Sequence, residues 1–364
     1  MKVRIKELGR IVTGTTPKTS IKDYYSINDY MFIGPSDLQN GKYIRKTEKH
    51  ISTTAYSDYK SRFLNVGDIC VSCIGYVGYI AKPTQLSLSN QQINSITQIN
   101  ENIVISDYLF YKLLSMNDYF QSINGNGSAV PIINKTIFEN IEIDIHTLAE
   151  QQHIVDILGT LDEKIENNEQ LINIFENLAA KKYLDFANKT STKIRLEDVI
   201  ELFDSKRIPL SSREREQRKG IYPYYGATGI LDYVNGFLFS GEYVLFAEDG
   251  TVTDTNGHPI VQLVNGSFWV NNHAHILKGK NGWNDYTLYV ALKQINVDKA
   301  VTGAVQPKIN QANLLSLEIP NLSNNNLQTI NTELAVVFHK VFHLRSENKK
   351  LQELKGLYLK KFFE

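Results

Sequence analysis

The sequence has few cysteines, no long hydrophobic run and a formal net charge of zero. Two cysteines among 364 residues cannot frame a disulfide scaffold, which fits a reducing compartment. No run approaches the ~18 apolar residues that a membrane span needs, and the N-terminal residues lack the hydrophobic core of a signal peptide. Lys plus Arg and Asp plus Glu both number 39, which excludes a uniformly basic coat protein but leaves local basic patches open. We therefore expect a soluble, cytoplasmic protein.

The motifs of catalysis are also missing. The sequence has no phosphate-binding loop of the form Gly-x-x-x-x-Gly-Lys-[Ser/Thr], no strand-linked Gly-x-Gly-x-x-Gly and no Gly-x-Ser-x-Gly elbow. It also lacks the Asn-Pro-Pro-aromatic tetrapeptide expected of an amino-group methyltransferase. Cys70 and Cys73 have metal-binding spacing, but without a second cysteine pair they are expected to be small buried side chains. The sequence thus predicts a non-catalytic chain without a cofactor.

Histidines and carboxylates in the second half of the chain are the remaining metal candidates. His273 and His275 would lie on one face of a strand, with His258 nearby in sequence, but no cysteine or carboxylate is fixed to them by spacing. Glu248 and Asp249 could supply the carboxylates of a metal-dependent nuclease. Because a glycine and a threonine follow them, an exposed turn is the simpler interpretation. We therefore expect no metal site, and the nuclease stays as a rival hypothesis.

What the sequence does contain is a tandem duplication. With 42% apolar and 21% charged residues, a chain of this length is expected to form two or more globular domains. Four short segments recur in the same order with modest changes of spacing, which predicts a repeat of about 180 residues. The segments that start at Val3, Phe63, Leu88 and Ala129 recur at Ile194, Phe237, Trp269 and Val305, and the last of them aligns Asn134 with Asn310.

Each repeat ends in a long stretch with helical spacing of apolar residues. The first stretch carries a net charge of −4 over residues 148–190 and the second +3 over residues 333–364, so the two helices are expected to pack on each other, antiparallel if a pseudo-twofold axis relates the repeats. Asn168 and Asn348 align at the same core position, where a buried asparagine fixes helix register; a surface asparagine is the alternative. Forty helical residues would make a spacer of roughly 60 Å. The apolar positions are Ile154, Ile157, Leu158, Leu161, Ile165, Leu171, Phe175 and Leu178, then Leu334, Val337, Phe338, Val341, Leu344, Leu351 and Leu354.

The first part of each repeat has the signals of a β-rich globule. Short runs rich in Ile, Val, Tyr and Phe alternate with Gly, Asn, Asp and Ser, and one further helical segment occurs in each. We therefore predict an α+β protein with two tandem, mixed but β-rich globules, each followed by a long helix. The predicted boundaries are 1–146 and 191–322 for the globules, and 147–190 and 323–364 for the helices.

Clustered cations accompany both globules. Residues 42–62 contain six Lys or Arg against two acidic residues, and residues 204–220 contain six against three, both next to tyrosines. Such clusters can contact DNA phosphates, while Arg, Asn and Gln can read base edges in the major groove. A solvated charged surface is the alternative for the clusters, and strand-end capping is the alternative for the amide-rich segments at 89–92 and 271–273.

Longer segments resemble a known family, the specificity (S) subunits of type I restriction–modification systems. The resemblance rests on YPYYGATGILDYVNGFLFSGEYVLFAEDG (222–250), WVNNHAHILKG (269–279) and KINQANLLSLEIP (308–320), and on the helix start that contains Glu150-Gln151-Gln152. It covers essentially the whole chain. The second helix departs from the pattern, because Asn325-Asn326-Leu327-Gln328 stands where the first has its Glu-Gln-Gln start.

The resemblance implies a function and partners. Each globule would be a target recognition domain that reads one half of a bipartite, asymmetric sequence in double-stranded DNA. The helices would set the distance between the half-sites and dock two methyltransferase subunits, which are joined by restriction subunits in the full complex. Those partners would bind S-adenosylmethionine and ATP, so no cofactor is expected in this chain.

The residues expected to contact DNA combine the basic clusters with the amide-rich segments. Two rivals of other classes remain, a metal-dependent nuclease and a coiled-coil adaptor that binds no DNA. A related type IIB-like system that cuts on both sides of its site could use a similar subunit. The predicted contacts are Lys18, Lys22, Arg45, Lys46, Lys49, Asn90 and Gln91 in the first globule, and Lys206, Arg207, Arg213, Arg215, Arg218, Tyr224, Tyr225, Asn271 and Asn272 in the second.

Overall fold

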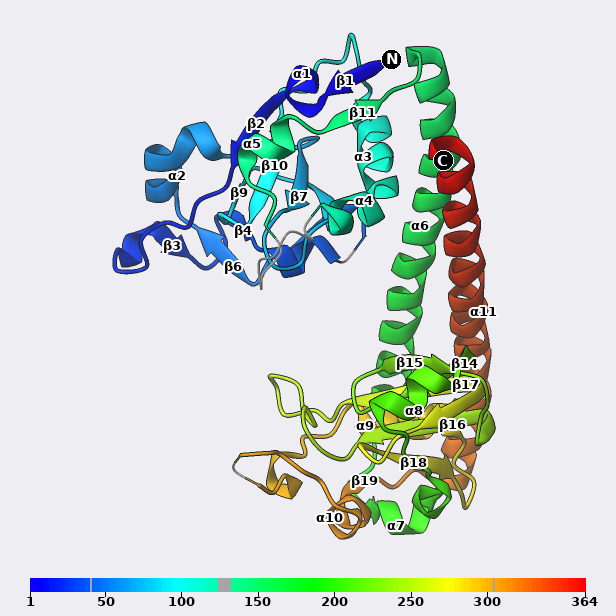
Figure 1. Cartoon of the computed structure of the whole chain (residues 1–364). Coiled ribbons are helices and arrows are strands. Elements are labelled where there is room, and N and C mark those ends of the chain that lie inside the picture. Colours follow the sequence, from blue (N-terminus) through cyan, green and yellow to red (C-terminus); the bar gives the residue numbers. More distant parts are fainter. Residues whose placement is uncertain (40, 124–131, 304) are drawn as a thin grey trace. The chain divides into compact units, whose positions relative to one another are not determined.

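The structure is a computed structural model that describes residues 1–39, 41–123, 132–303 and 305–364 (Figure 1). The chain divides into two compact units, which are described separately. Unit 1 comprises Met1–Glu166 and Asn348–Glu364, and unit 2 comprises Asn167–Glu347. Two helices of 40 residues, α6 (Leu148–Ala187) and α11 (Asn324–Phe363), each contribute one part to each unit.

Unit 1 contains a five-stranded sheet in the order β2-β10-β7-β8-β5 and a four-stranded sheet in the order β3-β6-β4-β9. Every residue of β7 and β10 is buried, because apolar clusters cover both faces of the first sheet. Cys70 faces one cluster and Cys73 the other, so the expectation of buried, free cysteines is confirmed. The elements are β2 (Arg10–Thr13), β3 (Tyr25–Ser26), β4 (Tyr30–Ile33), β5 (Tyr43–Ile44), β6 (Lys49–Ile51), α2 (Thr53–Tyr59), β7 (Ile69–Ser72), β8 (Ile80–Pro83), β9 (Ser87–Ser89), β10 (Ile93–Thr97), α3 (Ser106–Ser115), α4 (Asn117–Ser122) and α5 (Lys135–Glu139).

Unit 2 is built on one six-stranded sheet in the order β13-β18-β16-β17-β14-β15. Its helix α9 is buried along its whole length, and the side chain of Asn284 caps it by accepting a hydrogen bond from the Thr287 backbone N–H. The elements are α7 (Leu196–Val199), β13 (Ile200–Leu202), α8 (Ser212–Gln217), β14 (Lys219–Tyr225), β15 (Ile230–Val234), β16 (Phe239–Ala247), β17 (Val261–Val270), β18 (Ala274–Gly279), α9 (Asp285–Leu292) and α10 (Gln311–Ser316).

The duplication predicted from sequence is confirmed by strand register. In unit 1, β1 (Lys2–Arg4) pairs antiparallel with β11 (Glu142–Asp144), and Val3 lies opposite Ile143. In unit 2, β12 (Lys193–Arg195) pairs with β19 (Glu318–Pro320), and Ile194 lies opposite Ile319, the residues that align with that pair. The central strand order β2-β10-β7 of unit 1 recurs as β13-β18-β16 in unit 2. The two units therefore share this central topology, although the strands around it form two sheets in unit 1 and one sheet in unit 2.

Within each unit, parts of α6 and α11 contact each other. In unit 2, Lys182 pairs with Glu333 at 2.7 Å and Glu176 pairs with Arg345 at 2.7 Å. Residue numbers rise on α6 as they fall on α11, so the two parts run in opposite directions within this unit. In unit 1, Lys355 of α11 reaches Asp162 of α6 at 2.5 Å.

The predicted apolar stripe of α6 is wrong over part of unit 2. Ala179 and Tyr183 are buried in the core of unit 2, whereas Leu171 and Leu178 are 42% and 38% exposed. Ala179 and Tyr183 lie outside the predicted stripe, so the buried face of α6 here is set by its fit to the globule and not by the spacing of leucines alone. Over the described ranges, no helix combines the length and the apolar composition that a membrane crossing requires.

Candidate nucleic-acid interface

In unit 1, three loops meet where the neighbouring strands β2, β10 and β7 of the five-stranded sheet begin or end. They follow β2 (residues 14–22), follow β7 (73–79) and precede β10 (89–92), and we call them the edge loops of unit 1. The Thr15 backbone N–H donates to the Ser89 carbonyl at 2.8 Å, and the Cys73 N–H donates to the Gln92 carbonyl at 2.7 Å. The Thr16 hydroxyl donates to the side-chain carbonyl of Gln91 at 2.5 Å. The structure thus joins the loop that carries Lys18 and Lys22 to the loop that carries Asn90 and Gln91.

Three edge loops of unit 2 occupy the equivalent positions: residues 203–211 after β13, 248–251 after β16 and 271–273 before β18. A fourth, residues 305–310 before α10, joins them in unit 2. The Glu248 N–H donates to the His273 carbonyl at 2.8 Å, as the Cys73 N–H does to Gln92 in unit 1. The Ile309 N–H donates to the Glu248 carbonyl at 2.8 Å. Segments far apart in sequence therefore form one surface in each unit.

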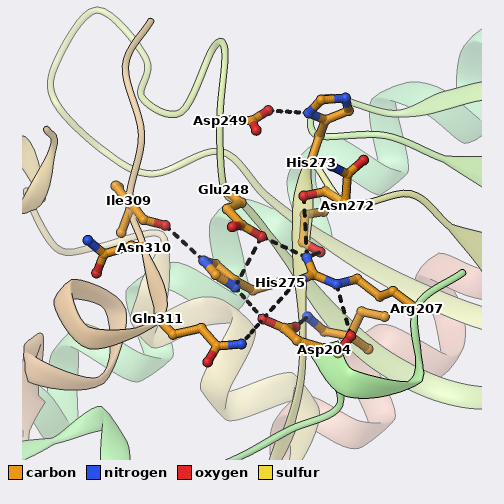
Figure 2. A network of polar contacts seen from close by, with 12 residues as sticks. Asp204, Arg207, Glu248, Asp249, Asn272, His273, His275, Ile309, Asn310 and Gln311 are labelled. Atoms are coloured by element: carbon orange, nitrogen blue, oxygen red, sulfur yellow. Dashed lines mark hydrogen bonds and ion pairs between the residues drawn. The ribbon is translucent and has the colours of Figure 1, made fainter. Parts of the chain in front are cut away.

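A buried ionic cluster lies beneath the edge loops of unit 2 (Figure 2). It consists of Asp204, Arg207, Glu248 and His275. The His275 ring is fully buried, with Nδ1 at 2.6 Å from Asp204 Oδ2 and Nε2 at 2.8 Å from the Ile309 carbonyl oxygen. Arg207 Nη1 donates to Glu248 Oε2 at 2.7 Å, and Nη2 lies 3.3 Å from Asp204 Oδ2.

The cluster keeps both carboxylates ionised. Burial acts to raise the pKa of Asp204, but the hydrogen bond and charge of His275, with further donors from Ile276 and Gln311, hold that pKa below its usual value. Burial acts in the same direction on the pKa of Glu248, and Arg207, His275 and Lys308 together hold it below its usual value. Two buried carboxylates are thus balanced by cations that contact them directly.

The same residues include the one metal-like group found among the described residues. One ligand atom each from Asp204, Glu248 and His275 lies within 4.8 Å of the others. However, Arg207 already donates to Glu248 and forms an ion pair with Asp204, and Lys308 lies 3.2 Å from Glu248. A metal ion would have to displace the guanidinium from both carboxylates and leave its buried charge without a counter-ion, which is costly. The residues fit a salt cluster and not a metal centre.

This arrangement corrects the sequence interpretation of two carboxylates. The prediction of an exposed turn is wrong for Glu248, whose side chain is only 12% exposed because it pairs with Arg207. Asp249 lies outside the cluster and pairs instead with the ring of His273 (Figure 2). His258 pairs with Asp254 at 3.5 Å, so the three histidines do not form one site.

Of the contacts predicted in unit 1, one is half-buried and six are exposed. Asn90 is half-buried and its side-chain oxygen accepts the Gln92 N–H, which is the turn-forming role named as the alternative. Lys49 begins β6 opposite Phe32 of β4, next to the strand β9 that leads to Asn90. Arg45 pairs with Glu166 of α6, away from the edge loops. The exposed members of the set are Lys18, Lys22, Arg45, Lys46, Lys49 and Gln91.

Several contacts predicted in unit 2 have interior positions and need correction. Tyr224 is 1% exposed and its hydroxyl accepts the Leu210 N–H at 2.8 Å, because parallel pairing of β14 with β17 sets it opposite Trp269 in the core. Asn271 is 5% exposed and accepts the His273 N–H, repeating the turn of Asn90.

The remaining contacts of this set range from partly buried to exposed. Arg207 belongs to the buried ionic cluster, and Tyr225 packs edge-on against Phe268. Arg215 is half-buried and pairs with Asp232 at 3.4 Å. The exposed members are Lys206, Arg213, Arg218 and Asn272.

Sequence reasoning missed several residues of these surfaces. Tyr76 is 68% exposed in the β7–β8 loop of unit 1, and Lys308 is exposed beside Glu248 in unit 2. Thr16 contacts Gln91 directly. An aromatic residue between two glycines in a turn, as Tyr76 is between Gly75 and Gly78, was a signal that could have drawn attention to this loop.

The two aligned asparagines of the long helices are buried. Asn168 is fully buried and donates to Glu347 of α11 at 2.8 Å within unit 2. Asn348 is 7% exposed and donates to the Ile165 carbonyl of α6 at 3.2 Å within unit 1. Both therefore contact the other helix, and the alternative of a surface asparagine does not apply.

A family model described as the type I restriction modification DNA specificity domain matches this chain twice, at residues 1–177 and 188–361. The chain belongs to this family. The match confirms the resemblance seen in the sequence and the prediction of a non-catalytic specificity subunit with two repeated domains.

Relatives support the same assignment. The type I restriction enzyme MjaIX specificity subunit of Methanocaldococcus jannaschii is 32% identical over 184 residues, which are 50% of this chain and 42% of that protein. The HindI specificity subunit of Haemophilus influenzae is 32% identical over 168 residues, which are 45% of this chain and 36% of that protein. The matched region therefore spans less than half the length of either relative. A crystal structure of a type I S subunit from M. genitalium has the same fold, with a TM-score of 0.59, 18% identity, and coverage of 100% of this chain and 96% of that one.

Proposed function

We propose that the specificity subunit reads a bipartite, asymmetric sequence in double-stranded DNA, with one half-site for each unit. One observation carries this proposal: three edge loops meet at equivalent positions in both units, but their side chains differ. Gln91 stands in unit 1 where Asn272 stands in unit 2; Thr16 donates to the Gln91 side chain, whereas Arg207, at the position of Thr16, donates to the Asn272 backbone carbonyl. Equivalent surfaces with different donors and acceptors select different bases.

The proposed contacts are the exposed residues on or beside the edge loops. Cations neutralise phosphates and fix the docking position, whereas amide side chains discriminate base edges. The recognition domains would span residues 1–146 and 191–322, and the helices residues 147–190 and 323–364. The proposed set is Lys18, Lys22, Lys49, Tyr76 and Gln91 in unit 1, and Lys206, Arg213, Arg218, Asn272 and Lys308 in unit 2.

The long helices would form an antiparallel coiled coil that sets the distance between half-sites. Within each unit, ion pairs and a buried asparagine join α6 to α11, which supports one fixed register. The apolar residues left exposed on α6 in unit 2 would dock the methyltransferase subunits, through which restriction subunits join. These residues are Leu171, Ile174 and Leu178. Since the target is genomic DNA, the complex would work in the cytoplasm.

The proposal is tested by sequencing adenine methylation in the host genome with this gene intact and deleted. Loss of one gapped, two-part adenine motif on deletion is the expected result, and it gives both half-sites and the spacer. An unchanged methylation pattern in cells that express the chain together with its methyltransferase would reject the proposal. Cleavage on both sides of the motif by the purified complex would assign the chain to the related type IIB-like systems.

A further inference from the structure

The buried ionic cluster of unit 2 has a neutral counterpart in unit 1. The Thr13 hydroxyl donates to Asn94 Oδ1 at 2.7 Å, and Asn94 Nδ2 donates to the Ile133 carbonyl at 3.4 Å. The repeat alignment sets Thr13 on Asp204, Asn94 on His275 and Ile133 on Ile309. Hydrogen bonds therefore join the same three aligned positions in both units, through Thr13 and Asn94 in unit 1 and through Asp204 and His275 in unit 2.

Both ring nitrogens of His275 face acceptors: Nε2 lies 2.8 Å from the Ile309 carbonyl oxygen, and Nδ1 lies 2.6 Å from Asp204 Oδ2. The carboxylates of Asp204 and Glu248 both contact the Arg207 guanidinium, and Lys308 approaches Glu248 from its exposed side at 3.2 Å. Removing the His275 ring therefore takes away a buried partner of Asp204 that no other cation of the cluster replaces in the same place.

The cluster ties four segments together. Asp204 and Arg207 belong to the loop after β13, Glu248 follows β16, and His275 lies on β18. The α10 segment joins through Gln311, whose Nε2 donates to Asp204 at 2.8 Å (Figure 2). These segments carry the proposed contacts Lys206, Asn272 and Lys308 within a few residues of the cluster.

Arg207 makes the most direct connection to the proposed DNA surface. Besides its two carboxylate partners, Nη1 donates to the carbonyl oxygens of Asn272 at 3.4 Å and Ala274 at 2.8 Å. Nε donates to the Asp204 backbone carbonyl at 3.1 Å, so the hydrogen bonds of the guanidinium reach one carboxylate and three backbone carbonyls. These bonds, fixed in direction, hold the backbone of the 271–274 turn in one conformation. The side chain is 13% exposed, which leaves it little surface for a base or a phosphate.

We propose that His275 and Arg207 are positioning residues for the second half-site: they fix the edge loops of unit 2 through buried charges and do not themselves touch DNA. The inference rests on the proposed function, since it assigns these residues to recognition by one unit only. It also replaces the direct DNA contact that the sequence predicted for Arg207.

The test uses the full chain co-purified with its methyltransferase and a DNA duplex that carries the motif found by methylation sequencing. Two further duplexes have either the first or the second half-site scrambled. His275→Asn removes the buried ring that pairs with the Asp204 carboxylate, so we expect it to lower affinity for the intact duplex by about tenfold or more, comparable to the loss of a base pair from the site. Discrimination of the half-site read by unit 1 should persist.

A matched double variant separates charge from shape. Asp204→Thr with His275→Asn copies the neutral connection of unit 1 and leaves Arg207 and Glu248 as a balanced pair. We expect it to recover most of the affinity lost in the single variant. Arg207→Lys keeps the positive charge but loses the planar set of N–H donors of the guanidinium. It should therefore weaken binding of the half-site that unit 2 reads. In unit 1, Asn94→Ala removes the equivalent connection and should weaken only the binding of the half-site that unit 1 reads.

Three results would overturn the inference: normal affinity of His275→Asn, equal loss at both half-sites, or a double variant no better than the single one. If His275→Asn fails to fold, the comparison of the double variant and Arg207→Lys with the unaltered chain decides the matter. A wild-type complex that does not distinguish the scrambled duplexes would instead reject the proposed function, so the two failures are distinct.

Discussion

Asn168 of α6 donates a hydrogen bond to Glu347 of α11 at 2.8 Å from a fully buried position in unit 2. A buried amide between helices contributes little to stability, because an apolar residue would pack there without a polar group to satisfy. It does penalise other registers, in which the amide would be buried without a partner.

Replacing Asn168 with leucine should therefore stabilise the chain while loosening its register. We expect Asn168→Leu to raise the free energy of unfolding by about 1 kcal/mol. The register is measured by trapping cysteines at positions 182 and 333 with a short bifunctional thiol reagent, because Lys182 Nζ and Glu333 Oε2, at the ends of the native side chains, lie 2.7 Å apart. Faster trapping in the native register after the substitution would contradict this role.

Lengthening the long helices should change only the spacer of the DNA target. Seven residues are about two helical turns, or roughly 10 Å, which corresponds to about three base pairs. Insertions of seven residues after positions 166 and 347 together should lengthen the methylated motif by that amount and leave both half-sites unchanged. Methylation sequencing reads the outcome, and an unaltered spacer would defeat the coiled-coil model.

Two residues of the unit 1 edge loops should affect binding in different ways. Gln91 is proposed to read a base, so Gln91→Ala should cost about 1–3 kcal/mol and relax one position of its half-site. Lys18 is proposed to contact a phosphate, so Lys18→Ala should weaken all sequences alike and reduce the salt slope by about 1. Titrations with intact and singly mismatched duplexes at several salt concentrations separate the two effects. Identical profiles for both variants would contradict the assigned roles.

The exposed apolar face of α6 should be needed for assembly and not for folding. Ile174 is 59% exposed, so Ile174→Glu should leave the thermal transition within a few degrees of the unaltered chain, while weakening methyltransferase binding by at least about tenfold. Ile27, which is 85% exposed in unit 1, offers a matched control as Ile27→Glu. Equal methyltransferase binding by both variants in co-purification and calorimetry would locate the docking surface elsewhere.

Asp68 should make unit 1 less stable as the pH rises. Burial raises the pKa of this carboxyl to about 6, against the opposing effect of hydrogen bonds from Asn65 and Gln98. A raised carboxyl pKa means that its contribution is fully present below the unfolded value of about 4 and is lost as the pH rises through 6. Between pH 5 and 7.5 we expect a loss of about 1–2 kcal/mol in urea unfolding, and Asp68→Asn should abolish it. The same slope in the variant would assign the effect to another group.

Much of the fold follows from the sequence because the duplication supplies an internal comparison. The segments that align Val3 with Ile194 and Ile143 with Ile319 are strands in both units, and their register matches. Asn134 and Asn310, aligned by sequence alone, both cap helices, α5 and α10. These features depend on local pattern, which a single sequence contains.

The surface of the candidate site was predictable only in part, because burial there depends on distant partners. Nothing in the run Tyr222–Tyr225 reveals that parallel pairing with β17 will bury Tyr224 and leave its neighbours half-exposed. The buried ionic cluster draws Asp204, Glu248 and His275 from three separate segments, so no short motif contains it. The sequence shows where cations cluster, but the fold decides which of them are exposed.

The ladders β1–β11 and β12–β19 have an evolutionary consequence. Each one brings the first strand of a globule beside its last strand, so the chain enters and leaves each globule at the same place. A genetic crossover at these two points would exchange a whole globule without cutting its hydrophobic core or its sheet. New combinations of half-sites could then arise in one recombination event, with every member of the resulting repertoire built on the same pair of helices.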